Sequence, residues 1–189
     1  MLRSLLAFFP LALIPAAADA QAKPERPWTL LVYGGADNNA DGPILDFLDD
    51  VRMAIDDDPG IELLLLLDRS EKFSNDATML GQDFTGARLY RLRKDSATRL
   101  SGGAEMPELT LDGEDAELDT ADADNVRRFI DWGKAHYPAL HYGVMIYSHA
   151  SGRTMCPDEE SGRDMGIPEL SQLLGEKQSV DFLALELCN

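Results

Sequence analysis

An apolar run at residues 61–67 (IELLLLL) constrains the fold of this chain more than any other feature. Because it lacks the polar alternation of a half-exposed strand, it is typical of a strand buried on both faces of a parallel sheet. Similar runs of strand length occur at residues 28–33, 142–147 and 180–187. A chain of 189 residues, 44% of them hydrophobic, is long enough to bury such a sheet within one domain.

Amphipathic segments between these runs predict helices. The first follows Asp41 and carries an apolar face at helical spacing. The second has Thr120 as its expected N-cap and ends before Pro138, and the third covers residues 167–176. The alternation of strands and helices predicts an α/β protein, with three αβα layers around a mostly parallel sheet. The face of the first helix consists of Ile44, Phe47, Leu48, Val51 and Ile55.

Residues 68–119 do not continue this pattern. They are polar and contain glycine, and a strand pattern is visible only at residues 87–92. We interpret the segment as an excursion from the sheet, formed by a hairpin and a loop. The sequence contains neither internal repeats nor low-complexity tracts, so it gives no reason to expect a repeat architecture.

The N-terminus has the pattern of a secretory signal peptide. Arg3 supplies a positive charge, an apolar segment follows, and Ala18-Asp19-Ala20 forms a cleavage site. The apolar segment is too short to span a bilayer. We therefore expect residues 1–20 to be a signal peptide cleaved after Ala20, residues 21–27 a linker, and residues 28–189 one exported domain. The mature protein is expected to be secreted or periplasmic.

The charge balance excludes some partners. Lys and Arg number 17 against 34 for Asp and Glu, which gives a formal net charge of −17. A surface of this sign repels nucleic acid and anionic lipid, so we expect no nucleic-acid partner and no membrane contact after signal removal. The same charge attracts basic peptides.

The ends of the predicted strands mark the candidate site, because active sites of open parallel sheets lie beyond the carboxyl ends of strands. The run at residues 142–147 leads into His149, and the run at residues 180–187 leads into Cys188. One helical crossover separates the two runs, which predicts neighbouring strands. Of the three histidines, His136 ends a helix and His141 precedes its strand, so only His149 lies at a carboxyl end.

A thiol beside an imidazole suits nucleophilic catalysis. The imidazole lowers the pKa of the thiol and can protonate a leaving amine. Backbone N–H groups of Ala150 and Cys188 are candidates for an oxyanion hole. The alternatives are structural, since Cys188 also fits a buried strand position and His149 a loop position. The other cysteine, Cys156, is expected in a loop, and a disulfide between the two cysteines is the usual outcome in an exported protein.

Three segments resemble the clostripain family of cysteine peptidases, which shares the caspase–legumain fold. They are residues 28–42 (WTLLVYGGADNNADG), 125–152 (NVRRFIDWGKAHYPALHYGVMIYSHASG) and 180–189 (VDFLALELCN). The resemblance implies a Cys–His dyad, which falls on Cys188 and His149 here. It also implies cleavage of peptide or protein substrates after Arg or Lys at P1.

Two positions depart from the pattern of the resemblance. Ala150 stands where glycine is usual, so an oxyanion role requires that its φ is not positive. Glu186 stands where aspartate is usual. Residues two apart in a strand project to the same face, so Glu186 is expected on the side of Cys188, where its carboxylate can receive a basic P1 side chain. A solvent-exposed carboxylate without a role is the alternative.

The sequence assigns no metal ligands. Asp37, Asn39 and Asp41 match the first half of an EF-hand loop, but Leu48 occupies the position of the bidentate glutamate. A turn with Asx caps at a helix N-terminus is the expected structure. The dyad chemistry requires no cofactor. The resemblance leaves a calcium requirement open, with its ligands unassigned.

The resemblance extends to one residue beyond Cys188, whereas the family continues further. We therefore expect a domain incomplete at its C-terminus and a 189-residue chain that is weakly active or inactive by itself. Two other functions stay open on the sequence: a catalytically inactive peptidase-like binding module or truncated fragment, and a calcium-binding adhesion module, which the mismatched loop disfavours.

Overall fold

The computed structural model describes residues 26–55, 58–74, 82–112, 115–176 and 180–188. The strands in this part of the chain are β1 (Arg26–Ala36), β2 (Ile61–Arg69), β3 (Gly86–Arg93), β4 (Ser96–Leu100), β5 (Ala139–Ser151), β6 (Thr154–Asp158), β7 (Arg163–Gly166) and β8 (Phe182–Cys188). The helices are α1 (Asp41–Ile55), α2 (Ala123–His136) and α3 (Ile167–Glu176).

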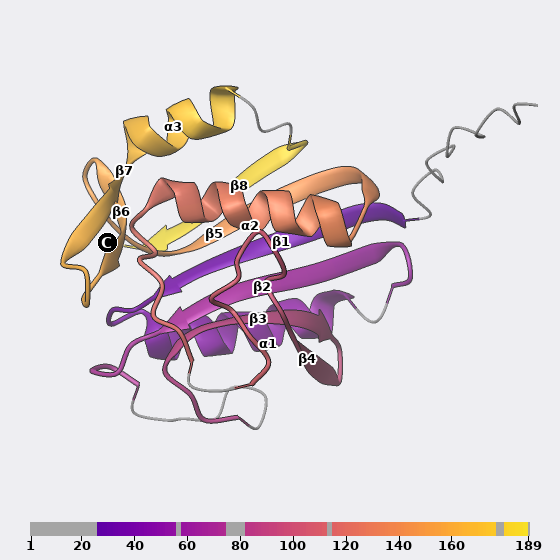
Figure 1. The fold of residues 1–189 in the computed structure, drawn as a ribbon, viewed down its shortest axis with the longest axis horizontal. Helices are drawn as coiled ribbons and strands as arrows, with labels where there is room; N and C mark the ends of the chain where they lie inside the picture. Colours follow the sequence, from indigo (N-terminus) through magenta and orange to yellow (C-terminus); the bar gives the residue numbers. More distant parts are fainter. Residues whose placement is uncertain (1–25, 56–57, 75–81, 113–114, 177–179, 189) are drawn as a thin grey trace, which may run out of the picture.

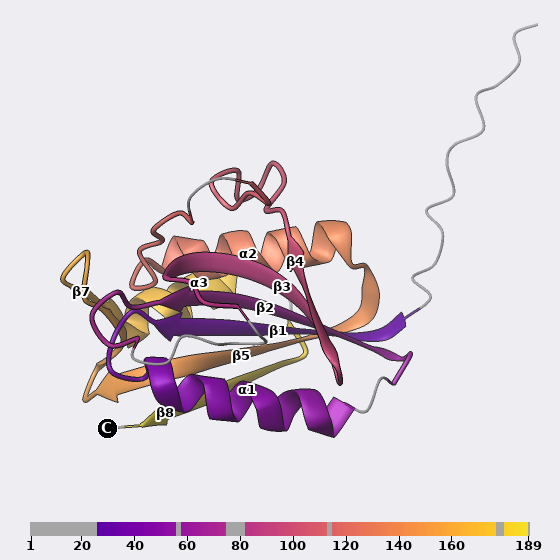
Figure 2. The ribbon, with the colours of Figure 1, turned by 90° about the horizontal axis from the view of Figure 1, so that it is seen from below.

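One mixed sheet organises these elements. Its strand order is β4-β3-β2-β1-β5-β6-β7, and β8 also pairs with β5. The central strands β2, β1, β5 and β8 are mutually parallel. Helix α1 covers one face of the sheet, and α2 and α3 cover the other (Figures 1 and 2). The predicted three-layer α/β fold is therefore confirmed, with a mixed sheet whose centre is parallel.

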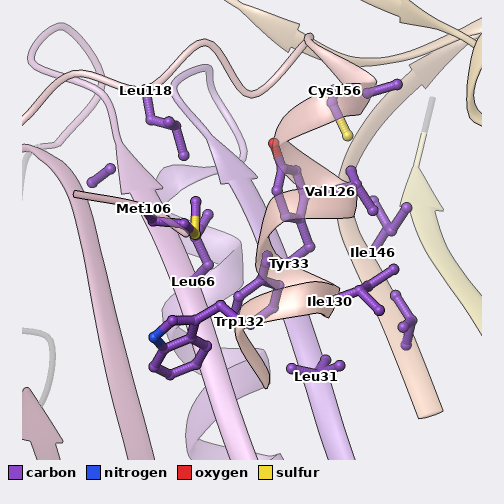
Figure 3. Close-up of a cluster of buried hydrophobic side chains, with 14 of the residues drawn as sticks. Leu31, Tyr33, Leu66, Met106, Leu118, Val126, Ile130, Trp132, Ile146 and Cys156 are labelled. Carbon is purple, nitrogen blue, oxygen red and sulfur yellow. The ribbon is translucent and has the colours of Figure 1, made fainter. Parts of the chain in front are cut away.

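The core lies on both faces of the sheet, as the apolar run in β2 predicted. Leu64 and Leu66 pack toward α2, in a cluster that also contains Phe129 and Trp132 (Figure 3). The residues between them in β2, Leu63, Leu65 and Leu67, pack on the opposite face toward α1, in a cluster with Ile44. Leucines at every position from 63 to 67 are buried. Burying an apolar side chain of this size contributes about 1.5–3 kcal/mol, so the two clusters hold both helical layers on the sheet.

The interpretation of residues 68–119 as an excursion from the sheet is wrong for its middle part. Strand β3 pairs antiparallel with β2, and β4 pairs antiparallel with β3, so both extend the sheet. Strand β3 coincides with the strand pattern at residues 87–92, whereas β4 has no counterpart in the prediction. Arg91 and Arg93 of β3 pair with Glu62, a buried carboxylate of β2. The two arginines therefore fit in a strand of the sheet because they neutralise the buried charge of Glu62.

The start of the second helix also differs from the prediction. Asp122, rather than Thr120, is the N-cap of α2, and its side chain accepts a hydrogen bond from the Asp124 N–H. The N–H and hydroxyl of Thr120 donate instead to the carboxylate of Asp158, at 2.8 and 3.1 Å. Because Thr120 hydrogen-bonds to the distant residue Asp158, it does not cap the helix, and Asp122 takes the N-cap position.

The predicted signal peptide and most of the predicted linker fall on residues 1–25, which lie outside the described residues. Strand β1 begins at Arg26, two residues before the apolar run. Across the described part of the chain, none of the helices has the length and apolar character that crossing a membrane requires.

Candidate catalytic site

The candidate site lies where β5 and β8 end side by side. The two strands are parallel neighbours, as predicted, and their register pairs His149 directly with Cys188. The remaining strand of this group, β1, pairs with the other side of β5 and ends at Ala36. Histidine and cysteine positions 39 residues apart in sequence are therefore brought together at the carboxyl edge of the sheet.

The backbone after His149 turns back as a hairpin. β5 continues to Ser151 and pairs antiparallel with β6, so that Ala150 lies opposite Met155. Gly152 makes the turn with a φ of 63°, a conformation that glycine adopts without strain. Among the described non-glycine residues, Cys156 alone has a positive φ. Ala150 therefore does not have a positive φ.

A polar network fixes this end of the sheet. The Ser148 hydroxyl donates to the Gly35 carbonyl at 2.6 Å. The side-chain amide of Asn38 donates to the same carbonyl at 3.0 Å and to the Pro157 carbonyl at 2.8 Å, and its oxygen accepts from Ala40 N–H at 2.8 Å. Asn38 therefore links the end of β1, the start of α1 and strand β6.

Sequence reasoning missed the role of Asn38 in positioning the hairpin that follows His149. The Asx turn itself was predicted, and the bond to Ala40 confirms it. The contact with Pro157 spans 119 residues, and a local turn pattern carries no information about such a partner.

The other two histidines lie away from this edge. His136 ends α2 and contacts Glu105 at 3.2 Å, and His141 lies in the amino-terminal part of β5, 3.0 Å from Asp181. All four side chains are substantially exposed. Both pairs are surface contacts, which contribute little to stability.

Glu186 lies next to the candidate dyad in β8. Its register partner is Tyr147, whose ring stacks on Phe47 of α1 with 4.7 Å between centroids. Glu186 is exposed. A carboxylate at this position is accessible to a cationic ligand.

Cys156 is buried among apolar side chains and is a free thiol (Figure 3). The prediction that it lies in a loop is wrong, because it belongs to β6. Burial raises the pKa of its thiol to about 12, although a hydrogen bond with Ser148 opposes the shift. The disulfide alternative is not realised for this residue.

We expect Cys156 to resist alkylation in the folded protein. Its thiol stays protonated at pH 8, far below its raised pKa, and thiols react as thiolates. Iodoacetamide at pH 8 should modify Cys156 at least about 100-fold more slowly in native protein than in urea, because burial adds to the protonation effect. Peptide mass spectrometry after timed quenching measures this. Equal rates in the two states would contradict the buried placement.

Three acidic side chains form a group that includes Asp37, the residue before Asn38. Asp37, Glu117 and Asp158 each have a carboxylate oxygen within 4.8 Å of the other two. Partial burial and then Glu160, Asp37 and Asp158 raise the pKa of Glu117 to about 8. Asp41 is not part of this group, because it pairs with Arg69. Asp37 and Asp41, which belong to the EF-hand half-pattern, therefore do not face a common site.

The family of the chain follows from sequence comparison. Residues 32–189 match the model of the clostripain family (Peptidase_C11). The chain is 33% identical over 176 residues to clostripain from Hathewaya histolytica, and the match covers 85% of this chain and 33% of that protein. The chain therefore belongs to the clostripain family, and it spans about a third of the length of this relative.

Solved structures agree with the fold. An inactive zymogen of a C11 protease from Parabacteroides distasonis superposes with a TM-score of 0.59 at 22% identity, over 86% of this chain and 42% of that chain. A secreted C11 cysteine protease from Bacteroides thetaiotaomicron, solved with an irreversible peptide inhibitor, gives 0.59 at 24% identity, over 86% and 43%. The α/β fold is thus that of the C11 cysteine proteases.

Proposed function

We propose that this chain carries the Cys–His dyad of an exported cysteine endopeptidase, with Cys188 as nucleophile and His149 as base. The observation that supports this most strongly is the register of β5 and β8, which makes positions 149 and 188 direct neighbours at the carboxyl edge of the sheet. Membership of the clostripain family supplies the reaction class. Residues 1–20, with their cleavage pattern, support export.

The proposed reaction proceeds through an acyl-enzyme. His149 takes the thiol proton, and the thiolate of Cys188 attacks the substrate carbonyl carbon. The tetrahedral oxyanion accepts hydrogen bonds from the backbone N–H groups of Ala150 and Cys188. When the C–N bond breaks, the imidazolium gives its proton to the leaving amine. Water, deprotonated by His149, then hydrolyses the thioester and restores the thiol.

The proposed substrates are peptides or proteins with Arg or Lys at P1. Glu186 supports this, since its exposed carboxylate lies two residues before the nucleophile and can pair with a cation. The formal net charge of −17 favours encounter with basic substrates. The dyad chemistry requires no cofactor.

Covalent labelling tests the proposal. A peptide chloromethylketone with P1 Arg is expected to label the full gene product at Cys188, and His149→Ala should slow the labelling by about 100-fold or more because the thiolate is lost. Tryptic mass spectrometry identifies the modified residue. No labelling of folded, reduced protein would contradict the proposal and leave a binding module.

The same labelling experiment also tests the preference for a basic residue at P1. Glu186→Gln keeps the side-chain size and removes the charge, so the preference for a P1 Arg over a P1 Leu reagent should fall by about two- to fivefold, which corresponds to one exposed charge contact. Asp164→Asn, an exposed change in β7, should leave the preference unchanged. An unchanged preference in Glu186→Gln would contradict the role of this residue alone.

A further inference from the structure

The ladder between β1 and β5 ends just before the candidate dyad. Its last pair is Gly34–Tyr147, although β1 continues beside β2 and β5 continues beside β8 and β6. Within these described strands, the next two residues of β5, Ser148 and His149, have ladder partners on the β8 side alone. A strand end that is paired on one side only has fewer contacts to hold it in place.

The Ser148 side chain supplies the connection that the ladder no longer makes. Ser148 has no exposed surface, and its hydroxyl donates to the Gly35 carbonyl of β1 at 2.6 Å. The side-chain amide of Asn38 donates to the same carbonyl at 3.0 Å and to the Ser148 hydroxyl at 3.4 Å. A side-chain donor thus takes the place of a backbone donor, and it joins the residue before His149 to the end of β1.

The hydrogen-bonding capacity of this hydroxyl is fully used. A serine hydroxyl has one donor and can accept two bonds. Its proton is donated to Gly35, and it accepts from Asn38. Its third partner is the Cys156 thiol, which hydrogen-bonds with Ser148 and stays protonated because burial raises its pKa to about 12. Buried polar networks that are fully satisfied rigidify their surroundings, so the end of β5 is fixed relative to both β1 and β6.

The backbone of β6 is distorted where it meets this hydroxyl. Cys156 has a φ of 49°, in the left-handed region that is unfavourable for a residue other than glycine, and the pairing of β6 with β7 is irregular at this point. Strained residues and bulges persist where the surrounding contacts determine them, and they are frequent beside active sites. At this bulge the Cys156 thiol contacts Ser148, and the Pro157 carbonyl accepts from Asn38. The strain in β6 is therefore accompanied by a set of contacts around one hydroxyl.

We propose that Ser148 is a positioning residue, which holds the backbone of His149 where its imidazole can exchange a proton with Cys188. The inference rests on the proposed peptidase function, because Ser148 acts through His149. The β5–β8 ladder pairs His149 with Cys188 on one side, and the Ser148 hydroxyl fixes the other side to β1. Proton transfer requires hydrogen-bond reach, and a displacement of about 1 Å lowers a rate by up to about 100-fold.

Ser148→Ala in the full gene product tests the inference. The variant should lower kcat for an arginyl amide substrate by about 10- to 100-fold, because His149 is less well placed for proton transfer. KM should stay within about twofold, since the groups that contact the substrate are unchanged. Steady-state kinetics measure both parameters. A rise in KM at an unchanged kcat would overturn the proposal, because it would place Ser148 in substrate binding.

Thr29→Val is the matched control. Thr29 is also fully buried in the sheet, and its hydroxyl donates to a backbone carbonyl, that of Tyr137, at 2.8 Å. It lies in the amino-terminal half of β1, away from the candidate dyad. Each variant loses one buried hydrogen bond, so each should lower the Tm by about 2–4 °C, but Thr29→Val should leave kcat within about twofold. An equal loss of kcat in the two variants would overturn the proposal in favour of a general effect of stability.

Covalent labelling separates slower chemistry from incomplete folding. With the P1 Arg chloromethylketone, Ser148→Ala should reach the same final extent of labelling at Cys188 as the unaltered protein, at a rate lower by about 10-fold or more. A smaller final extent that accounts for the whole loss of activity would indicate fewer folded molecules and would overturn the proposal.

The same experiment distinguishes the two levels of inference. If the unaltered protein is not labelled at Cys188, the proposed peptidase function fails, and the positioning role fails with it. If the unaltered protein is labelled and Ser148→Ala is labelled at the same rate, the positioning role alone is overturned.

Discussion

Replacing His149 with alanine in the full gene product is expected to lower kcat/KM for an arginyl amide substrate by about 10³-fold or more. In the proposed reaction the imidazole both generates the thiolate and protonates the leaving amine. Loss of general acid–base catalysis alone lowers the rate by about 10²–10⁴-fold. Cys188→Ala should cost at least as much, because no other group can form the acyl-enzyme. Single-turnover and steady-state rates of amide release measure both variants.

The double variant distinguishes a dyad from two independent contributions. If His149 and Cys188 act as one unit, the double alanine variant should be no slower than Cys188→Ala, because the first loss already removes the pathway. His141→Ala is the matched control: its exposed pair with Asp181 lies in the amino-terminal part of β5, so kcat/KM should change less than about twofold. Additive losses, or a large loss in the control, would contradict the assignment.

The second large effect is expected on stability. Arg69→Met should lower the free energy of unfolding by about 3–5 kcal/mol, because it leaves Asp41 as a buried charge without its partner. The two side chains are almost fully buried and form two parallel hydrogen bonds, of 2.9 and 2.8 Å. They join the end of β2 to the first turn of α1. Urea unfolding followed by circular dichroism measures the change.

Two further variants separate this mechanism from a simple loss of packing. Arg127→Met on α2 breaks exposed pairs with Asp124 and Asp131, and it should cost less than about 1 kcal/mol. Adding Asp41→Asn to Arg69→Met removes the stranded charge, so the double variant should recover part of the lost stability. A double variant less stable than Arg69→Met would show that the unpaired carboxylate is not the cause.

The sequence predicted the parts of the fold that depend on local periodicity. Residues 61–67 form a strand buried on both faces because a run of leucines has no polar side to expose. Helix α3 occupies the predicted range 167–176, and β8 lies beside β5, as a single crossover between parallel strands implies. The pairing of residues 149 and 188 followed from the same topology.

The sequence failed where a charge is neutralised by a distant residue. The pattern at residues 87–92 predicted strand β3 but not its place in the sheet, where Arg91 and Arg93 pair with Glu62 of β2. The expected cap at Thr120 was lost to Asp158, which is 38 positions away. The prediction also failed for a strand without a clear local pattern: Cys156 was expected in a loop but lies in β6, which pairs with β7.

By itself the sequence determined the layered α/β fold, the family and the two residues of the candidate dyad, because periodicity, strand order and a family pattern are written along the chain. The tertiary structure alone decided the contact of Asn38 with β6, the burial of Cys156, and the approach of the carboxylates of Asp37, Glu117 and Asp158 to one another. The physical reason is that electrostatic and hydrogen-bond energies depend on distance in space, and these partners are separated along the chain by up to 121 residues, from Asp37 to Asp158.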